Sequence, residues 1–221
     1  MAERIHLEQH VLQGNKLIAG QNRDRFQRHH VLAVNVLSSP GAGKTTLLER
    51  LAEQLKTKLR MAVIEGDIAT TLDSERIAAH GVQAVQINTH GACHLDARMV
   101  MQALEYVELA DIDLLIIENV GNLVCPAEFD LGEELDIVVL SATEGEDKVA
   151  KYPFVFKKAD AVILNKTDLL PYIPFDVERF EAEVRLLNVA APIFQVSALK
   201  RDGLDEWIGW LCGKLEAADP Q

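Results

Sequence analysis

The sequence predicts an α/β fold with a doubly wound, mostly parallel sheet of about seven strands. Short apolar runs recur along the chain, and segments with apolar residues at helical spacing separate them. Runs that are apolar throughout are typical of strands that helices bury on both faces. We expect strands at residues 31–37, 61–65, 82–87, 114–118, 137–141, 161–165 and 193–196.

The helical segments organise the chain into one main domain. Residues 1–28 are interpreted as a helical, charged arm, residues 29–217 as the domain, and residues 218–221 as a disordered tail. The last helix is expected to begin near Gly203. The apolar residues that share a helix face are Leu47, Leu48, Leu51 and Leu55; Val100, Ala103, Leu104 and Val107; and Leu204, Trp207, Ile208, Leu211 and Leu215.

Composition excludes several classes of protein. The chain has 221 residues, 48% of them hydrophobic, and a formal net charge of −12, which disfavours a nucleic-acid surface. We find no run of 18 uncharged apolar residues, and hence expect no membrane span. The first residues lack the apolar region of a signal peptide, so we expect a cytoplasmic protein. We expect no disulfides among the three widely spaced cysteines in that reducing compartment.

A glycine-rich turn joins the first expected strand to the first expected helix of the domain. It reads Ser-Ser-Pro-Gly-Ala-Gly-Lys-Thr over residues 38–45, and this order is typical of a phosphate-binding loop. Lys44 would reach the β- and γ-phosphates, and the Thr45 hydroxyl would ligate Mg²⁺. Ser38 stands where the usual pattern begins with glycine. The residues expected to bind the phosphates are Gly41, Ala42, Gly43, Lys44, Thr45 and Thr46.

A second motif, Asn165-Lys166-Thr167-Asp168, follows a later buried strand and indicates guanine. The Asp168 carboxylate can accept from both N1–H and N2–H₂ of guanine, whereas adenine presents an acceptor at N1. Asn165 would brace the loops, and the Lys166 stem would lie along the base. Alone, the motif could be an ordinary turn. The loop after the next strand would touch guanine O6 through a backbone N–H, at Ser197, Ala198 and Leu199.

Two acidic residues at expected strand ends, Asp67 and Glu118, could complete the Mg²⁺ site with Thr45. Either could instead be a turn residue. The backbone N–H of Gly121 is expected to sense the γ-phosphate, because Glu-x-x-Gly is a variant of a common GTPase pattern. Asn122 stands where many fast GTPases have Gln, and no arginine finger is apparent. We therefore predict slow hydrolysis of GTP, with a catalytic set of Lys44, Asp67, Glu118 and Gly121.

Thiol and imidazole side chains suggest a second chemistry. Cys93 and His94 lie in a glycine-containing loop, and Cys125 follows Gly121 by four residues. Such ligands suit Zn²⁺ and Ni²⁺, although a buried structural cysteine is also common. Three ligands leave a four-coordinate site incomplete, and a symmetric dimer could supply the rest.

Together these motifs resemble the HypB family of GTPases. The strings that carry the resemblance are Ser-Ser-Pro-Gly-Ala-Gly-Lys-Thr-Thr, Glu-Gly-Asp, Cys-His-Leu-Asp-Ala, Glu-Asn-Val-Gly-Asn-Leu-Val-Cys-Pro and Asn-Lys-Thr-Asp. The resemblance extends from about residue 15 to residue 215. It implies a P-loop GTPase fold of the dimerising class and a role in nickel insertion during maturation of [NiFe] hydrogenase.

The resemblance implies further properties of the site. It places Ni²⁺ or Zn²⁺ at a dimer interface on Cys93, His94 and Cys125, and it implies a homodimer that GTP favours. It makes Lys148 a candidate for a nucleotide contact across the dimer. The implied partners are a HypA-type nickel chaperone and, indirectly, the hydrogenase large-subunit precursor. The sequence lacks the cysteine motif and the histidine-rich stretch of some members, so we expect delivery or regulation without storage of many nickel ions.

Three other interpretations remain open at this point. A urease accessory GTPase would centre its metal on Cys-Pro-His, whereas Ala127 follows Cys125-Pro126 here. A small-molecule P-loop kinase would leave the Asn-Lys-Thr-Asp motif unexplained. A non-catalytic switch would use the cysteines only for structural zinc.

Overall fold

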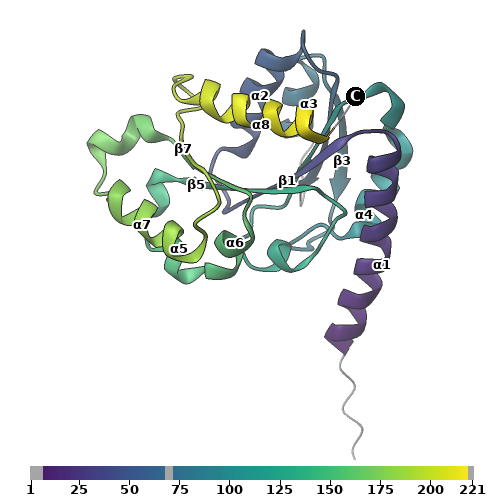
Figure 1. Cartoon of the computed structure of the whole chain (residues 1–221), viewed down its shortest axis with the longest axis horizontal. Helices are drawn as coiled ribbons and strands as arrows, with labels where there is room; N and C mark the ends of the chain where they lie inside the picture. Colours follow the sequence, from purple (N-terminus) through teal and green to yellow (C-terminus); the bar gives the residue numbers. More distant parts are fainter. Residues whose placement is uncertain (1–6, 68–71, 219–221) are drawn as a thin grey trace, which may run out of the picture.

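A seven-stranded parallel sheet forms the centre of the computed structural model, which describes residues 7–67 and 72–218 (Figure 1). The strand order is β3-β2-β4-β1-β5-β6-β7, and every pairing is parallel. This confirms the predicted fold class. The strands are β1 (Leu32–Ser38), β2 (Met61–Asp67), β3 (Gln83–Asn88), β4 (Leu114–Glu118), β5 (Leu135–Ser141), β6 (Ala161–Asn165) and β7 (Ile193–Gln195).

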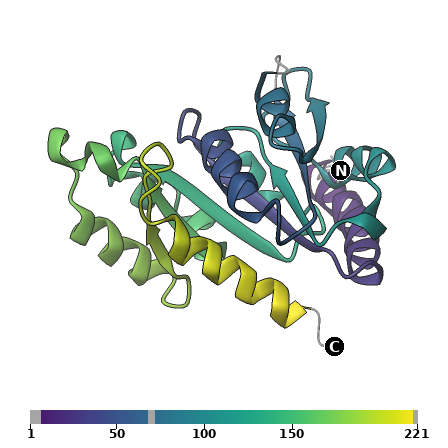
Figure 2. The same ribbon diagram turned by 90° about the horizontal axis from the view of Figure 1, so that it is seen from above.

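Helices cover both faces of the sheet. Helices α2, α3 and α8 pack on one face, while α1, α4, α5, α6 and α7 lie on the other (Figures 1 and 2). Their bounds are α1 (Leu7–Arg28), α2 (Lys44–Leu55), α3 (Leu72–Ala78), α4 (Ala97–Ala103), α5 (Lys148–Lys151), α6 (Pro153–Lys158), α7 (Val177–Leu187) and α8 (Leu204–Ala218). Short 3-10 helices are η1 (Leu104–Tyr106), η2 (Leu109–Asp111), η3 (Cys125–Glu128), η4 (Ala142–Glu144) and η5 (Thr167–Tyr172). None of the helices in the described ranges has the length and apolar character needed to cross a membrane.

The expected N-terminal arm is helix α1, which packs against the sheet and α4. Ala19 and Phe26 are buried, and the buried Asn22 amide donates to the backbone oxygens of Ala97 and Leu131 at 2.8 and 2.9 Å. Residues 1–6 of the arm lie outside the described residues. At the other end α8 includes Ala218, which was expected in the tail, and the remaining residues 219–221 are not described.

Because all strands are parallel, their carboxyl ends meet at one edge of the sheet, where ligands of doubly wound folds bind. The phosphate loop follows β1, Asp67 and Glu118 end β2 and β4, and Asn165 ends β6. The topology thus brings the predicted nucleotide residues to one edge.

A half-buried carboxyl pair, Glu133 and Asp136, lies at the start of β5. Burial, and then the Asp136 charge, raise the pKa of Glu133 to about 8; burial also raises the pKa of Asp136. The two side chains are hydrogen-bonded, and Asp136 Oδ1 accepts from Asn35 Nδ2 at 2.8 Å. The raised pKa of Glu133 favours its protonated form at neutral pH.

This pair predicts how stability changes with pH. The pKa of Glu133 is raised in the folded state, so the folded protein binds more protons than the unfolded chain between about pH 4.5 and 8. The free energy of unfolding should fall as pH rises through this window, by at most about 1.4 kcal/mol per pH unit. Denaturant titrations of Glu133→Gln should show a flatter pH profile, whereas the exposed neighbour change Glu134→Gln should not. Equal slopes in wild type and Glu133→Gln would contradict the assignment.

Candidate functional site

The phosphate loop has the backbone shape that the sequence predicts. Gly41 and Gly43 have φ of 76° and 93°, in the left-handed region, and α2 begins at Lys44. A Cβ on Gly43 would lie 2.7 Å from Asn165 Nδ2, so glycine is required there for the loops to meet. The buried Ser38 hydroxyl accepts a 2.8 Å hydrogen bond from Lys44 Nζ. Ser38, which stands where the usual motif begins with glycine, therefore gives Lys44 a hydrogen-bond partner within the loop.

A cavity of about 350 Å³ opens beside this loop. Its walls include the expected Lys44, Thr45, Asp67, Glu118 and Gly121. They also include Glu65, Asp73 and Arg76, which are not among the site residues predicted from the sequence. A charged residue at the end of the otherwise apolar run of β2 was a usable signal for Glu65, since charges are rarely buried without a function or partner. For Asp73 and Arg76 on α3 no such signal exists.

The carboxylates of this cavity suit a hard cation. Thr45 Oγ1 donates to Glu118 Oε1 at 2.9 Å, and burial raises the pKa of Glu118 against the opposing effect of Lys44. Burial, then the Glu118 charge, raise the pKa of Glu65 to about 8. Oε2 of both glutamates is buried and has no hydrogen-bond partner among the described residues. Buried, unpartnered carboxylate oxygens beside a hydroxyl are the ligands Mg²⁺ prefers, so the residues present fit this ion.

The guanine-type motif lies directly against the phosphate loop. Asn165 Nδ2 donates to Ala42 O at 2.9 Å, and its Oδ1 accepts from Ala198 N at 3.1 Å. Lys166 Nζ donates to Gly41 O at 2.7 Å. Asn165 thus braces the loops as predicted.

Asp168 is held from the following loop. Ser197 Oγ donates to Asp168 Oδ1 at 2.6 Å, which fixes the carboxylate and leaves its other oxygen for a ligand. Leu199, in the same loop, is exposed. The structure therefore brings the two predicted base-recognition loops together.

Gly121 abuts the phosphate loop and has no room for a side chain. A Cβ there would lie 2.9 Å from Pro40 Cα, and the next residue, Asn122, forms an isolated antiparallel bridge with Ser38. The segment after β4 is thereby held against the loop that would bind phosphate.

The close contact predicts a nucleotide-specific defect in Gly121→Ala. The added methyl should push the segment off Pro40, at about the 1–3 kcal/mol typical of overpacking. We expect affinity for a non-hydrolysable GTP analogue to fall at least about tenfold, with GDP affinity little changed, in equilibrium titrations with a fluorescent nucleotide. The matched control is Gly213→Ala, because nothing lies within 4 Å of a Cβ there. An equal loss for both nucleotides would contradict the γ-phosphate role.

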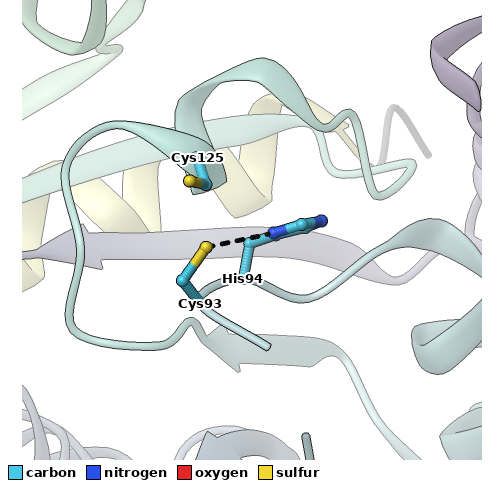
Figure 3. Close-up of side chains that lie close together, drawn as sticks. All are labelled: Cys93, His94 and Cys125. Carbon is cyan, nitrogen blue, oxygen red and sulfur yellow. Dashed lines mark hydrogen bonds between the residues drawn. The ribbon is translucent and has the colours of Figure 1, made fainter. Parts of the chain in front are cut away.

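Cys93, His94 and Cys125 come together on the surface, as the sequence suggested (Figure 3). Their possible ligand atoms all lie within 4.8 Å of one another, and Cys93 Sγ is 3.7 Å from His94 Nδ1. The loop before α4 carries the first two, and Cys125 opens the short helix η3. The His94 ring stacks on Phe129, with centroids 3.9 Å apart.

The titratable groups of this cluster differ in how readily they would bind a metal ion. Burial lowers the pKa of His94, which favours the neutral imidazole that binds metals. A hydrogen bond with Cys93, then burial, raise the pKa of the Cys125 thiol, so a metal ion would have to displace its proton. Two sulfurs and one imidazole nitrogen are a donor set for Zn²⁺ or Ni²⁺ and leave a coordination position open.

Two predicted residues lie at the margins of the site. Lys148 begins α5, with Nζ 4.0 Å from Glu144 Oε2, and is not among the described residues that line the cavity. Thr46 accepts a 3.3 Å hydrogen bond from Arg76 Nη2, whose guanidinium also pairs with Glu49. A contact of Lys148 with nucleotide would need a second copy of the chain.

The fold and the two loops define a P-loop protein of the GTPase type. The chain belongs to the CobW/HypB/UreG family, whose nucleotide-binding domain matches residues 32–195. Among curated proteins, it is 51% identical to hydrogenase maturation factor HypB of Azotobacter chroococcum, over 94% of this chain and 68% of that protein. It is 49% identical to the HypB of Escherichia coli K12, over 94% and 71%.

Solved structures agree with this placement. A crystal structure of HypB from Archaeoglobus fulgidus matches with a TM-score of 0.86 and 39% identity, over 92% of this chain and 99% of that one. HypB from Helicobacter pylori in complex with nickel matches with a TM-score of 0.88 and 40% identity, over 92% and 96%. A LAO/AO transport system kinase, at 21% identity and a TM-score of 0.59, shares the fold alone.

Proposed function

We propose that this protein is a GTP-hydrolysing metallochaperone that binds nickel or zinc and assists nickel insertion during [NiFe] hydrogenase maturation. One observation carries the proposal: the thiol–imidazole cluster lies beside the segment of residues 118–121 that lines the cavity, and Cys125 belongs to the continuation of that segment. Gly121 touches the phosphate loop at Pro40, and Cys125 follows it by four residues. The names of the HypB relatives and the nickel complex of one neighbour support the choice of metal and pathway.

In this proposal the cavity binds GTP with Mg²⁺. Lys44 leaves Ser38 for the β- and γ-phosphates, while Thr45, Asp67 and Glu118 hold the cation. Mg²⁺, when bound, would neutralise charge that develops on the phosphates. Asp168, held by Ser197, accepts from guanine.

We propose that hydrolysis is slow because the side chains near Gly121 are already engaged. Asn122 Nδ2 donates to Cys93 O at 3.3 Å, and its Oδ1 accepts from Val124 N at 3.0 Å. That arrangement ties the side chain to the metal loop and to its own turn, which holds it in one orientation. Arg76, at the cavity wall, is paired with Asp73 and Glu49. We expect turnover well below the median enzyme value of about 10 per second.

We propose that the metal site of Cys93, His94 and Cys125 is completed by a second copy of the chain. Three ligands on an exposed surface leave coordination incomplete, and a twofold axis would bring two such clusters together. The GTP-bound dimer would also allow Lys148 of one copy to reach the nucleotide of the other. A HypA-type chaperone would exchange nickel here in the cytoplasm, where thiols remain reduced, with the hydrogenase large-subunit precursor as the indirect recipient.

The test combines metal titration with molecular mass. Protein loaded with Mg²⁺ and either GDP or a non-hydrolysable GTP analogue is titrated with Ni²⁺ and with Zn²⁺, while light scattering records the mass. We expect one Cys93–His94–Cys125 site per chain and a dimer favoured by the analogue. The protein should also hydrolyse GTP, but not ATP, to release phosphate. Metal binding without these residues, or a monomer under all conditions, would contradict the proposal.

A further inference from the structure

We propose that Asn119 is the positioning residue that couples the nucleotide cavity to the Cys93–His94 half of the metal site. This inference rests on the proposed function and adds to it a second connection, separate from the chain path between Gly121 and Cys125. Asn119 follows β4, lines the cavity and is 1% exposed.

One amide oxygen joins two segments that the proposed function places at opposite ends of the mechanism. Asn119 Oδ1 accepts from Val120 N at 2.9 Å, beside the γ-phosphate sensor, and from Leu95 N at 3.1 Å, beside His94. Both acceptor positions of the oxygen are thereby used. A movement of residues 119–121 towards phosphate must either carry Leu95 with it or break a buried hydrogen bond.

The other end of the Asn119 side chain is anchored in the sheet. Nδ2 donates to Asn35 Oδ1 at 3.1 Å, and Asn35 on β1 donates in turn to Asp136 at 2.8 Å. Asn35 is 1% exposed. The amide is therefore held in one orientation, and its oxygen cannot rotate away from Leu95 and Val120 without leaving buried groups unpaired.

Leu95 also packs against β2, the strand that ends in Asp67. A Cβ on Gly66 would lie 2.7 Å from Leu95 Cγ, and Leu95 is fully buried. The residue after His94 is thus clamped between the end of β2 and Asn119. A shift at the end of β2, or of Asn119 after β4, would therefore move Leu95 and with it the adjacent residue His94.

Asn15 supplies a matched control for this connection. Its Oδ1 accepts from Ala97 N at 2.8 Å, two residues after Leu95, but the side chain comes from α1, and its other hydrogen bond goes to Asp130 O. Asn15→Ala removes a buried amide that holds the same segment without touching residues 119–121.

The experiment measures Zn²⁺ affinity of the full chain with Mg²⁺ and either GDP or a non-hydrolysable GTP analogue. The readout is the ratio of the two dissociation constants, which a merely structural defect would not change. We expect wild type and Asn15→Ala to show a ratio of at least about fivefold, and Asn119→Ala a ratio at most about half that of wild type, the remainder being carried by the chain path from Gly121 to Cys125. A preserved ratio in Asn119→Ala overturns the inference alone. A wild-type ratio near one removes the linkage of the proposed function, and the inference with it.

A second measurement uses wild type and covers the case in which Asn119→Ala does not fold. Amide hydrogen exchange of the Zn²⁺-bound protein is compared with GDP and with the analogue. Exchange at Leu95 and Val120 should change together by at least about fivefold, while Ala97, held by Asn15, stays constant. If the exchange rate of the Gly121 amide changed between the two nucleotides while that of Leu95 did not, the inference would be overturned.

Discussion

Asp168→Asn should weaken GTP binding by about 10²- to 10⁴-fold and shift preference towards xanthosine triphosphate. The carboxylate would accept two hydrogen bonds from guanine, each worth about 1.5–3 kcal/mol because a charged group takes part. In Asp168→Asn the amide NH₂ would face the N–H donors of guanine, which cannot accept a hydrogen bond from it. Xanthine presents an oxygen at C2, which can. Ser197 still has an oxygen to donate to, so the loop should keep its shape. Competition binding with GTP, xanthosine triphosphate and ATP measures the effect.

The control for this prediction is Asp202→Asn. Asp202 lies in the neighbouring loop, bonded to Ser197 only through its backbone, and its side chain is exposed. The same loss of charge there should leave base preference unchanged. Unaltered GTP affinity in Asp168→Asn would exclude the guanine site.

Cys125→Ser should lower Zn²⁺ or Ni²⁺ affinity by more than about a hundredfold. It removes one of two thiolates, and even groups that merely support a metal ligand are worth about 10- to 100-fold. Serine keeps the size of the side chain, so the segment from Gly121 should keep its position. Competition with a chromophoric chelator measures the affinity.

Cys212→Ser provides the matched control, because Cys212 is half-buried in α8 and packs against the apolar core. Its loss should leave metal binding intact. Equal metal affinity of wild type and Cys125→Ser would contradict a site on Cys93, His94 and Cys125.

The strand positions could be predicted because the buried strands of a parallel sheet are nearly continuous apolar runs. Their ends could not be predicted where polar residues continue the ladder. β2 extends to Asp67 because Gly66 and Asp67 pair with Ile87 and Asn88, and β5 begins early because Asp136 pairs with Asn35. Backbone hydrogen bonds hold these residues in the sheet whatever their side chains.

The site could be predicted where a motif fixes spacing along the chain, as in the phosphate loop. The parallel topology then brings Asp67, Glu118 and Asn165 to the same edge. Contacts between distant segments could not be predicted from the sequence. Nothing in the string Glu-Asn-Val-Gly indicates that Asn119 accepts from Leu95, or that Arg76 reaches Thr46 from α3. Such partners depend on how loops pack after the sheet has formed.

The central claim is that guanine nucleotide and metal are thermodynamically linked, and a four-sided binding cycle tests it most directly. Zn²⁺ dissociation constants are measured with GDP and with a non-hydrolysable GTP analogue, and the two nucleotide dissociation constants are measured with and without Zn²⁺. We predict at least a fivefold nucleotide effect on Zn²⁺ affinity, and the same factor in the reverse direction, since linkage is reciprocal. Zn²⁺ affinity that is the same with either nucleotide would contradict the account.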